Sequence, residues 1–190
     1  MGQLASTGQL RASFLRIAIV TVPAILLLGS LSAVIAGSAE TNPWFEALAK
    51  PDFMPPGWMF GAAWTLLYAL MGLAAAIILH ASGARGRGVA LTLFLVQLAL
   101  NLAWSPMFFA AHRVAASFWL IVVILVLAIA TTIAFWRIRR VAGWLLLPYL
   151  AWLAFAGLLN HRIHILNPDA ANATSVGQGV EMSLPPTPQR

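Results

Sequence analysis

The composition of this chain of 190 residues is that of a membrane protein, with 61% hydrophobic residues, 8% charged residues and a mean hydropathy of +0.87. A soluble protein needs about a quarter of its residues charged to cover its surface, so soluble enzymes and disordered regulators are excluded. The net charge of +6 does not indicate a nucleic-acid partner, because the 11 basic residues are scattered between apolar runs. The chain has no cysteine, which excludes disulfides, thiolate nucleophiles and Cys-ligated metals.

Five segments free of Asp, Glu, Lys and Arg are each long enough to cross a hydrocarbon core of about 30 Å, which takes about 20 apolar residues. They predict an all-α bundle of five transmembrane helices, since a β-barrel needs alternating segments instead of continuous apolar runs. We expect the helices at about residues 17–39, 57–79, 88–110, 114–137 and 141–166, within a membrane domain of residues 14–167. The last three connections allow only tight turns between antiparallel neighbours.

The first apolar segment has the general form of a secretory signal, because it follows Arg11 and Arg16 and ends in Ala36-Gly37-Ser38-Ala39. Its apolar core is longer than the roughly 7 to 15 residues of a typical signal, so we expect an uncleaved first helix. Cleavage would leave four helices. The connection 40–56 has room for structure, whereas the polar, proline-rich tail 168–190 is predicted to be disordered.

The basic residues indicate the orientation of the bundle. With five helices the termini lie on opposite sides, and seven basic residues share the side of the N-terminus against four on the other: Arg11, Arg16, Arg85, Arg87, Arg137, Arg139 and Arg140 against Lys50, Arg113, Arg162 and Arg190. The positive-inside rule then predicts a cytoplasmic N-terminal segment, residues 1–13, and an outward C-terminus. This bias favours a bacterial inner membrane, with an outer membrane as the alternative.

Polar residues inside a span must face protein or a water-filled cavity, and the third segment contains two, Gln97 and Asn101, one helical turn apart. Trp104, Ser105 and Phe108 continue the same stripe at i+3, i+4 and i+7 from Asn101. The stripe predicts an inward face. The alternative to a ligand site is an interhelical hydrogen bond, which contributes about 1 kcal/mol with no ligand involved.

Aromatic stripes on two further helices complete a candidate slot. The second segment places on one face Trp64, Tyr68, Met71 and Ala75, and the fifth places Tyr149, Trp152, Ala156 and Asn160. Flat rings beside small residues suit a broad, planar, mostly apolar ligand, because buried aromatic contacts add about 0.5 to 1.5 kcal/mol each. Each stripe alone is also compatible with an ordinary packed core.

Groups for acid–base or metal chemistry are scarce within the spans. All five carboxylates lie in the first loop or the tail, so no proton relay crosses the membrane. The four histidines flank spans, and His161 and His164, at i and i+3, would supply only two ligands to a metal. We therefore expect neither a metal nor an obligatory cofactor.

The ordered motifs of the chain resemble the tryptophan-rich sensory protein family, also called the translocator protein or peripheral benzodiazepine receptor family. The stretches that carry the resemblance are Asn42 to Leu48, Lys50-Pro51, Pro55 to Trp58, Phe60, Trp64-Thr65, Leu67-Tyr68, Met71-Gly72, Gln97 to Asn101, Trp104 to Pro106, Phe108-Phe109, Trp144, Pro148 to Leu150, Trp152 and Leu159 to Asn167. Together they cover about residues 14 to 168.

The resemblance implies a membrane protein that binds porphyrins such as protoporphyrin IX and haem, with a role in tetrapyrrole transport or stress-linked regulation. By position, it places in the ligand pocket Pro55, Trp64, Tyr68, Asn101, Trp104, Trp152 and Ala156, and in the first loop, which forms a lid, Trp44 and Phe45. Tyr149 is added to these candidates because it lies on the aromatic stripe of the fifth segment. We expect a binding protein rather than an enzyme.

Two alternatives to simple binding follow from the same resemblance. One is light-dependent porphyrin degradation, in which Trp64 and Trp152 would exchange electrons with the excited macrocycle, and the other is a passive carrier. The resemblance also implies a homodimer through the third helix, where Ala99 and Ala103 permit close packing. Specific cholesterol binding is not expected, because the end of the fifth helix reads Asn160-His161-Arg162-Ile163-His164, without the tyrosine of the animal pattern.

Overall fold

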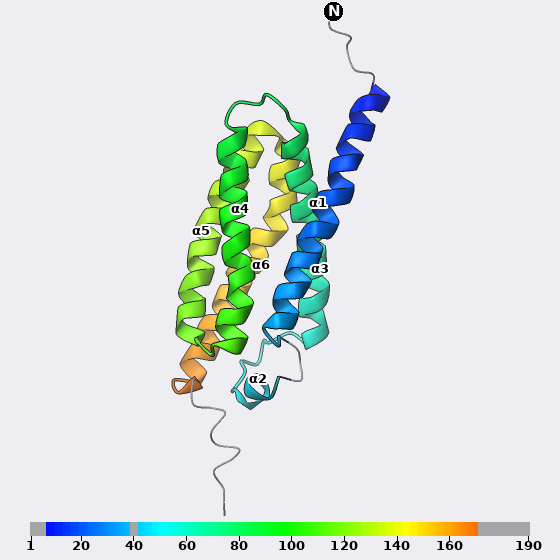
Figure 1. Cartoon of the computed structure of the whole chain (residues 1–190). Coiled ribbons are helices and arrows are strands. Elements are labelled where there is room, and N and C mark those ends of the chain that lie inside the picture. The colour runs from blue at the N-terminus through cyan, green and yellow to red at the C-terminus, as the bar shows by residue number, and fades with distance from the viewer. Residues whose placement is uncertain (1–6, 39–41, 171–190) are drawn as a thin grey trace, which may run out of the picture.

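The structure, a computed structural model, describes residues 7–38 and 42–170. Its long helices are α1 (Thr7–Ile35), α3 (Gly57–His80), α4 (Arg87–Ser105), α5 (Val114–Ile138) and α6 (Arg140–Leu166). A π-helical turn, η1 (Pro106–Ala110), continues α4, and a short helix, α2 (Pro43–Ala47), lies between α1 and α3. Five helices are long and apolar enough to span a membrane, and the described residues form no strand. The predicted all-α bundle of five transmembrane helices is confirmed (Figure 1).

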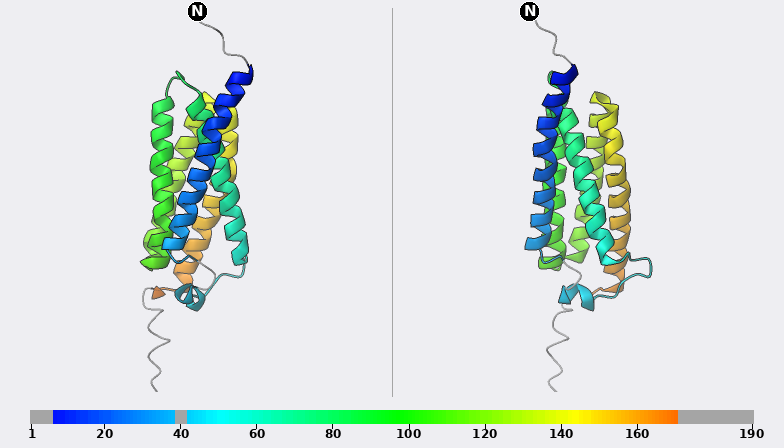
Figure 2. Two further views of the ribbon diagram at one scale, coloured as in Figure 1. Left: turned by 45° about the vertical axis from the view of Figure 1, so that its right-hand side comes forward. Right: turned by 90° about the vertical axis from the view of Figure 1, so that its right-hand side faces the viewer.

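The long helices stand side by side and alternate in direction (Figure 1, Figure 2). The main contacts join α1 to α3, α3 to α6, α6 to α5 and α5 to α4. The start of α1 and the connections α3–α4 and α5–α6 lie at one end of the bundle, and α2 and the last turns of α6 lie at the other (Figure 1). Short connections between apolar helices leave few alternatives to this arrangement.

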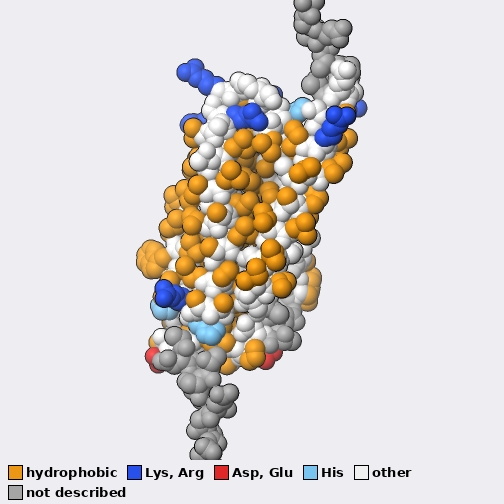
Figure 3. Space-filling model, in the orientation of Figure 1, with side chains coloured by type: hydrophobic (Ala, Val, Ile, Leu, Met, Phe, Trp, Pro, Cys, Tyr) orange, Lys and Arg blue, Asp and Glu red, His pale blue; other side chains and the backbone are white. Residues whose placement is uncertain are grey.

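On the face that Figure 3 shows, the surface of the bundle is apolar over most of its length, and Lys and Arg side chains lie near its ends. Large apolar side chains point outward, among them Val34 at 78% and Ile19 at 70% exposure, both on α1. In water such a surface would drive aggregation, but in a bilayer it is the surface that lipid covers. The chain is therefore an integral, multi-pass membrane protein.

The first helix differs from the predicted span of 17–39 at both ends. It starts at Thr7, so part of the segment 1–13 is helical, and it ends at Ile35. The end has a physical cause: Gly37 takes a left-handed φ of 62°, its N–H donates to Val34 O at 3.1 Å, and the N–H of Ser38 donates to Ala33 O at 3.0 Å. These two bonds form a Schellman motif, which stops a helix that hydropathy alone would continue.

The transition from α4 into η1 is explained by a proline. Pro106 has no N–H, so it cannot donate to the carbonyl of Leu102 one turn earlier. That carbonyl accepts instead from Ser32 Oγ of α1 at 2.6 Å, while Ala111 N donates to Pro106 O at 2.9 Å, five residues back. The wider π turn and the Ser32 hydroxyl together satisfy the backbone, and they tie α1 to α4 beside the site described below.

Helices α1 and α3 approach each other closely at Gly72. A Cβ at this position would lie 2.7 Å from Val22 Cα, so only glycine fits without a shift of the backbone. Thr21 Oγ1 of α1 donates to Gly72 O at 3.1 Å across the same contact. Small residues that allow such contact are a common means of packing helices in a bilayer. This contact fixes the position of α1 along the axis of α3.

Candidate functional site

A cavity of about 320 Å³ lies inside the half of the bundle nearest α2. Side chains of all five long helices line it, and Phe45 of α2 and Met54 of the following segment close its end. Among the described residues, none of those that line the cavity carries a charge. Pockets for small molecules have volumes of about 300–1,000 Å³, so the cavity is at the lower end of that range.

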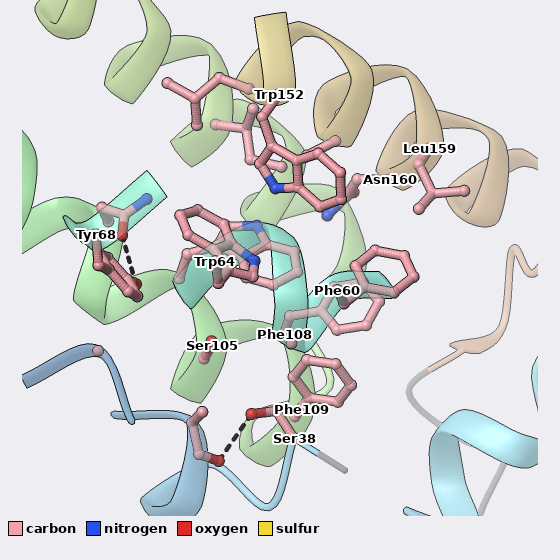
Figure 4. Close-up of a pocket in the computed structure, with 18 of the residues that line it drawn as sticks. Ser38, Phe60, Trp64, Tyr68, Ser105, Phe108, Phe109, Trp152, Leu159 and Asn160 are labelled. Carbon is pink, nitrogen blue, oxygen red and sulfur yellow. Dashed lines mark hydrogen bonds between the residues drawn. The ribbon is translucent and has the colours of Figure 1, made fainter. Parts of the chain in front are cut away.

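One wall of the cavity is built from aromatic rings of α3 and α6 (Figure 4). Trp64 and Trp152 meet edge to face, with ring centroids 6.3 Å apart and planes at 81°. Trp64 also stacks on Tyr68 at 5.1 Å, and Phe60 meets Trp152 at 5.7 Å. The rings hold one another in place by these contacts and form an apolar wall, in which the Trp152 ring stands nearly perpendicular to those of Trp64 and Phe60.

A second group of aromatic lining residues comes from α4 and η1. Trp104 stacks on Phe108 with centroids 5.0 Å apart and planes at 16°, and Phe109 packs edge to face against both rings. The π turn sets the spacing of these side chains, because it shifts Phe108 and Phe109 relative to a continuous α-helix. Aromatic side chains from the three predicted stripes, on α3, α4 and α6, therefore line one cavity.

The deep end of the cavity is closed by hydrogen bonds between helices. Tyr68 Oη donates to Asn101 Oδ1 at 3.0 Å, and just below it Tyr149 Oη donates to Gln97 Oε1 at 2.8 Å. The Tyr68 ring lies against Gly29 of α1, where any side chain would overlap it. Gln97 thus serves interhelical packing alone, whereas Asn101 both packs and lines the cavity.

Seven of the ten candidate ligand-binding residues line the cavity: Phe45, Trp64, Tyr68, Asn101, Trp104, Trp152 and Ala156. Tyr149 does not line the cavity. It lies on the same face of α6 as Trp152 but about one turn deeper in the bundle, where it is 1% exposed. Pro55 lies in the segment that precedes α3 and is outside the lining. Trp44 is also outside, since its ring packs against Phe108 and His112.

The first loop is tied to the end of α6 and the residues that follow it. Asn167 Oδ1 accepts from Ala49 N at 2.8 Å, and Asn167 Nδ2 donates to Ala49 O at 2.9 Å. Trp44, 2% exposed, stacks on His112 at 4.3 Å, and its Nε1 donates to Ala170 O at 2.8 Å. These contacts form a latch between the first loop and the segment after α6.

The latch corrects one expectation and adds residues that the sequence did not reveal. The predicted disordered tail of 168–190 begins too early, because Ala170 is buried and its carbonyl is bonded. Residues 171–190 lie outside the described part of the chain. Asn167 was part of a family motif, but only the fold brings it to Ala49.

Helix α1 contributes lining residues that no stripe indicated. Gly29, Ser30 and Ala33 face the cavity from this helix, together with Leu26. Their signal in the sequence was weak, because small residues in an apolar segment also occur at ordinary helix contacts. Asn160 lines the cavity as well, at the end of the α6 stripe that contains Trp152.

The paired histidines lie away from the cavity. His161 packs against Phe118 with centroids 5.0 Å apart, and neither His161 nor His164 lines the cavity. Among the described residues, no three side chains of His, Asp or Glu come close enough to hold a metal ion. The chemistry available to the cavity is thus aromatic contact and neutral hydrogen bonding.

A comparison with protein families decides the relationship that the motifs indicated, because the model of the TspO/MBR family matches residues 19–166. The chain belongs to this family. It is 34% identical over 141 residues to "Protein CrtK" of Rhodobacter capsulatus, covering 74% of this chain and 86% of that protein. It is 39% identical over 143 residues to "Tryptophan-rich protein TspO" of Chlorobaculum tepidum, covering 73% and 90%. Bovine "Translocator protein" is 38% identical over 152 residues, covering 75% and 88%.

Proposed function

We propose that the chain is a membrane receptor for porphyrins, such as protoporphyrin IX and haem, and for similar planar, apolar ligands. The observation that carries the proposal is the uncharged slot between the Trp64–Trp152 wall and the Trp104–Phe108 wall, beneath a latched lid. Aromatic side chains of α3, α4, η1 and α6 around one uncharged cavity favour a flat ring system over a compact or flexible ligand. The names of the relatives, sensory protein and translocator protein, are compatible with such a receptor.

The size of the cavity adds a mechanistic requirement. At about 320 Å³ it is near the lower limit for small molecules, and a macrocycle with its side groups needs more space. Entry of a porphyrin would therefore require the lid to open, with one edge of the ring inserted between the indoles. The charged propionates would stay at the lid, where water and the exposed Lys50 can reach them.

We propose that the role of the protein is tetrapyrrole transport or stress-linked regulation. We further propose that it lies in an inner membrane, with the Arg-rich end of the bundle in the cytoplasm, and that it forms a homodimer through α4. On α4, Leu95, Val96, Ala99 and Ala103 are exposed on the surface, where a second copy could pack. Pulsed distance measurements between spin labels on α4 in liposomes would test the dimer. The absence of a defined short distance would contradict it.

Porphyrin degradation by light is the second candidate, favoured by the position of two indoles in direct edge-to-face contact at the cavity wall. Trp64→Phe keeps an aromatic ring but removes the more easily oxidised indole. Loss of light-dependent product with retained dark binding would support degradation, and unchanged product formation would contradict the role of Trp64.

The experiment that tests binding is a dark titration of purified protein with protoporphyrin IX, followed by tryptophan fluorescence. Trp64→Ala and Trp152→Ala should each weaken saturable binding by about tenfold, or about 1.4 kcal/mol. Trp119→Ala is the matched control, because Trp119 is 66% exposed on α5 and lies outside the cavity. Non-saturable quenching that is equal in all variants would indicate partitioning into detergent and would contradict the proposal.

A further inference from the structure

A groove lies on the outer surface of the bundle between α5 and α6, apart from the cavity inside. It has a volume of about 470 Å³, and it is lined by Ile129, Thr132, Ile133, Trp136 and Arg137 of α5 and by Leu147 and Leu150 of α6. None of these residues lines the cavity. Ile133 is 49% exposed, so the groove opens toward the surrounding lipid, and its occupant would come from the bilayer.

The groove is apolar along its length and charged at one end. Its lining on α5 extends from Ile129 to Arg137, about 12 Å at the helical rise of about 1.5 Å per residue. The Thr132 hydroxyl donates to Ala128 O at 2.7 Å within α5, so it offers no free donor. Among the described lining residues only Arg137, in the last turn of α5, is charged. The groove thus matches a long apolar chain that ends in an anionic group.

Trp136 forms a fixed wall of the groove beside Arg137. Its ring packs against Gly143, where a Cβ would lie 2.6 Å from Trp136 Cε3, and against Trp144 with centroids 4.6 Å apart. Trp144 is itself 59% exposed, in the first turns of α6. Tryptophans at the ends of spans lie at the level of the lipid headgroups. Arg137 is therefore at the level of a lipid phosphate, and the rest of the groove extends into the hydrocarbon.

The basic residues around this end of the groove have no carboxylate near them in the described part of the chain. Arg137, Arg139 and Arg140 lie within four positions of one another, and all three are exposed. The described carboxylates lie at the opposite end of the bundle, on α2 and in the segments that follow α2 and α6 (Figure 1). Arg87, in contrast, donates to two carbonyls at the end of α3. The cluster at the α5–α6 connection is therefore open to an external anion.

We propose that the groove is a binding site for one anionic phospholipid. An acyl chain would lie against Ile133 and Leu150, and the headgroup phosphate would lie at Arg137. The proposed orientation places this end of the bundle in the cytoplasmic leaflet, where anionic lipids collect basic segments. The inference does not depend on porphyrin binding, because no residue of the cavity takes part in it.

Two other occupants fit the groove less well. Phosphatidylcholine has the same phosphate, but its choline cation would lie beside three arginines. A second copy of the chain would, in a symmetric contact, bring two arginine clusters together without a carboxylate between them. An anionic headgroup has neither disadvantage.

The test compares two lipids with identical acyl chains, phosphatidylglycerol and phosphatidylcholine. The full chain in detergent is titrated with an equimolar mixture, and native mass spectrometry separates protein with one bound molecule of either lipid. The wild type should retain phosphatidylglycerol at least about fivefold more strongly. This ratio corresponds to about 1 kcal/mol, the attraction of about one arginine near the membrane surface.

Arg137→Gln should reduce the preference to within about twofold, because Arg139 and Arg140 lie outside the groove lining, where their charges are screened. Arg85→Gln is the matched control. It removes the same charge at the same end of the bundle, but Arg85 lies in the α3–α4 connection, outside the groove. This variant should keep the wild-type preference.

Ile133→Trp tests the apolar part of the site, since it fills the groove and leaves every arginine in place. It should lower the retention of phosphatidylglycerol by about fivefold. Arg137 and Ile133 are both exposed, so the lipid-free variants should keep the melting temperature of the wild type.

Several outcomes would overturn the inference. An equal loss of preference in Arg137→Gln and Arg85→Gln would indicate attraction by overall charge, and unchanged retention by Ile133→Trp would exclude the groove. Displacement of the lipid by millimolar glycerol phosphate, which has no acyl chain, would indicate a simple anion site. Dimers that lack lipid and are lost in Ile133→Trp would assign the groove to a second copy. No preference in the wild type would remove the lipid site and leave the proposed porphyrin site unaffected.

Discussion

Removal of the Asn167 side chain should open the lid without unfolding the bundle. Asn167→Ala deletes the two hydrogen bonds that join Ala49 to the end of α6, at 2.8 and 2.9 Å. A hydrogen bond contributes about 0.5–1.5 kcal/mol net, and these two are exposed, so the loss should be about 1–2 kcal/mol. The open population of the lid should therefore rise roughly 5- to 30-fold.

Native-state hydrogen exchange resolved by residue measures this population. The amides of residues 44–49 should exchange faster by the stated factor, while those of α5 should not change. Asn167→Asp is the informative control, because it keeps an acceptor for the Ala49 N–H but loses the donor to Ala49 O. Its lid should open less than that of the alanine variant. Unchanged exchange at Ala49, or equal acceleration throughout the bundle, would refute the assignment of Asn167 to a latch.

Two further substitutions test the packing of α1. Gly72→Ala would place a Cβ 2.7 Å from Val22 Cα, so we expect a destabilisation of about 1–3 kcal/mol. It should be seen as a lower melting temperature in detergent. An unchanged melting temperature would show that α1 and α3 can move apart without a cost. Ser32→Ala leaves the Leu102 carbonyl without its donor and should lower the stability by about 1 kcal/mol in the same assay. Ser30→Ala is the control, because Ser30 is exposed at the cavity rim, and its melting temperature should stay close to that of the wild type. Equal effects of the two serine variants would contradict the role given to Ser32.

The helices could be predicted from the sequence because a bilayer demands continuous apolar segments, and this chain interrupts them only with short charged connections. The start of α3 and the bounds of α5 and α6 agree with the prediction to within about a residue, which is the usual uncertainty of helix ends. The end of α1 was missed, since hydropathy does not register the left-handed Gly37. The helix η1 was missed for a similar reason, because its cause is the lost N–H of Pro106.

The aromatic part of the site could be predicted from helical periodicity, which put Trp64, Tyr68 and Trp152 on inward faces. Periodicity gives the face of a helix but not the depth at which a cavity ends, and Tyr149 was therefore included although it lies below the floor. It also gives nothing about contacts between distant segments. The latch joins residues 118 positions apart, at Ala49 and Asn167, and no local pattern marks such a pair.

The proposed function places a planar ligand between the indoles of the cavity, and the chain offers a direct test because it has only eight tryptophans. In a nitrogen-15 correlation spectrum each indole N–H gives one signal, assignable by single substitution to phenylalanine. On dark titration with protoporphyrin IX, the signals of Trp64, Trp104 and Trp152 should move together and saturate. Those of Trp58 and Trp119, which are 67% and 66% exposed on the outer surface, should stay in place. Movement of the outer signals with the cavity signals unchanged would place the ligand in the surrounding detergent or lipid and contradict binding in the cavity.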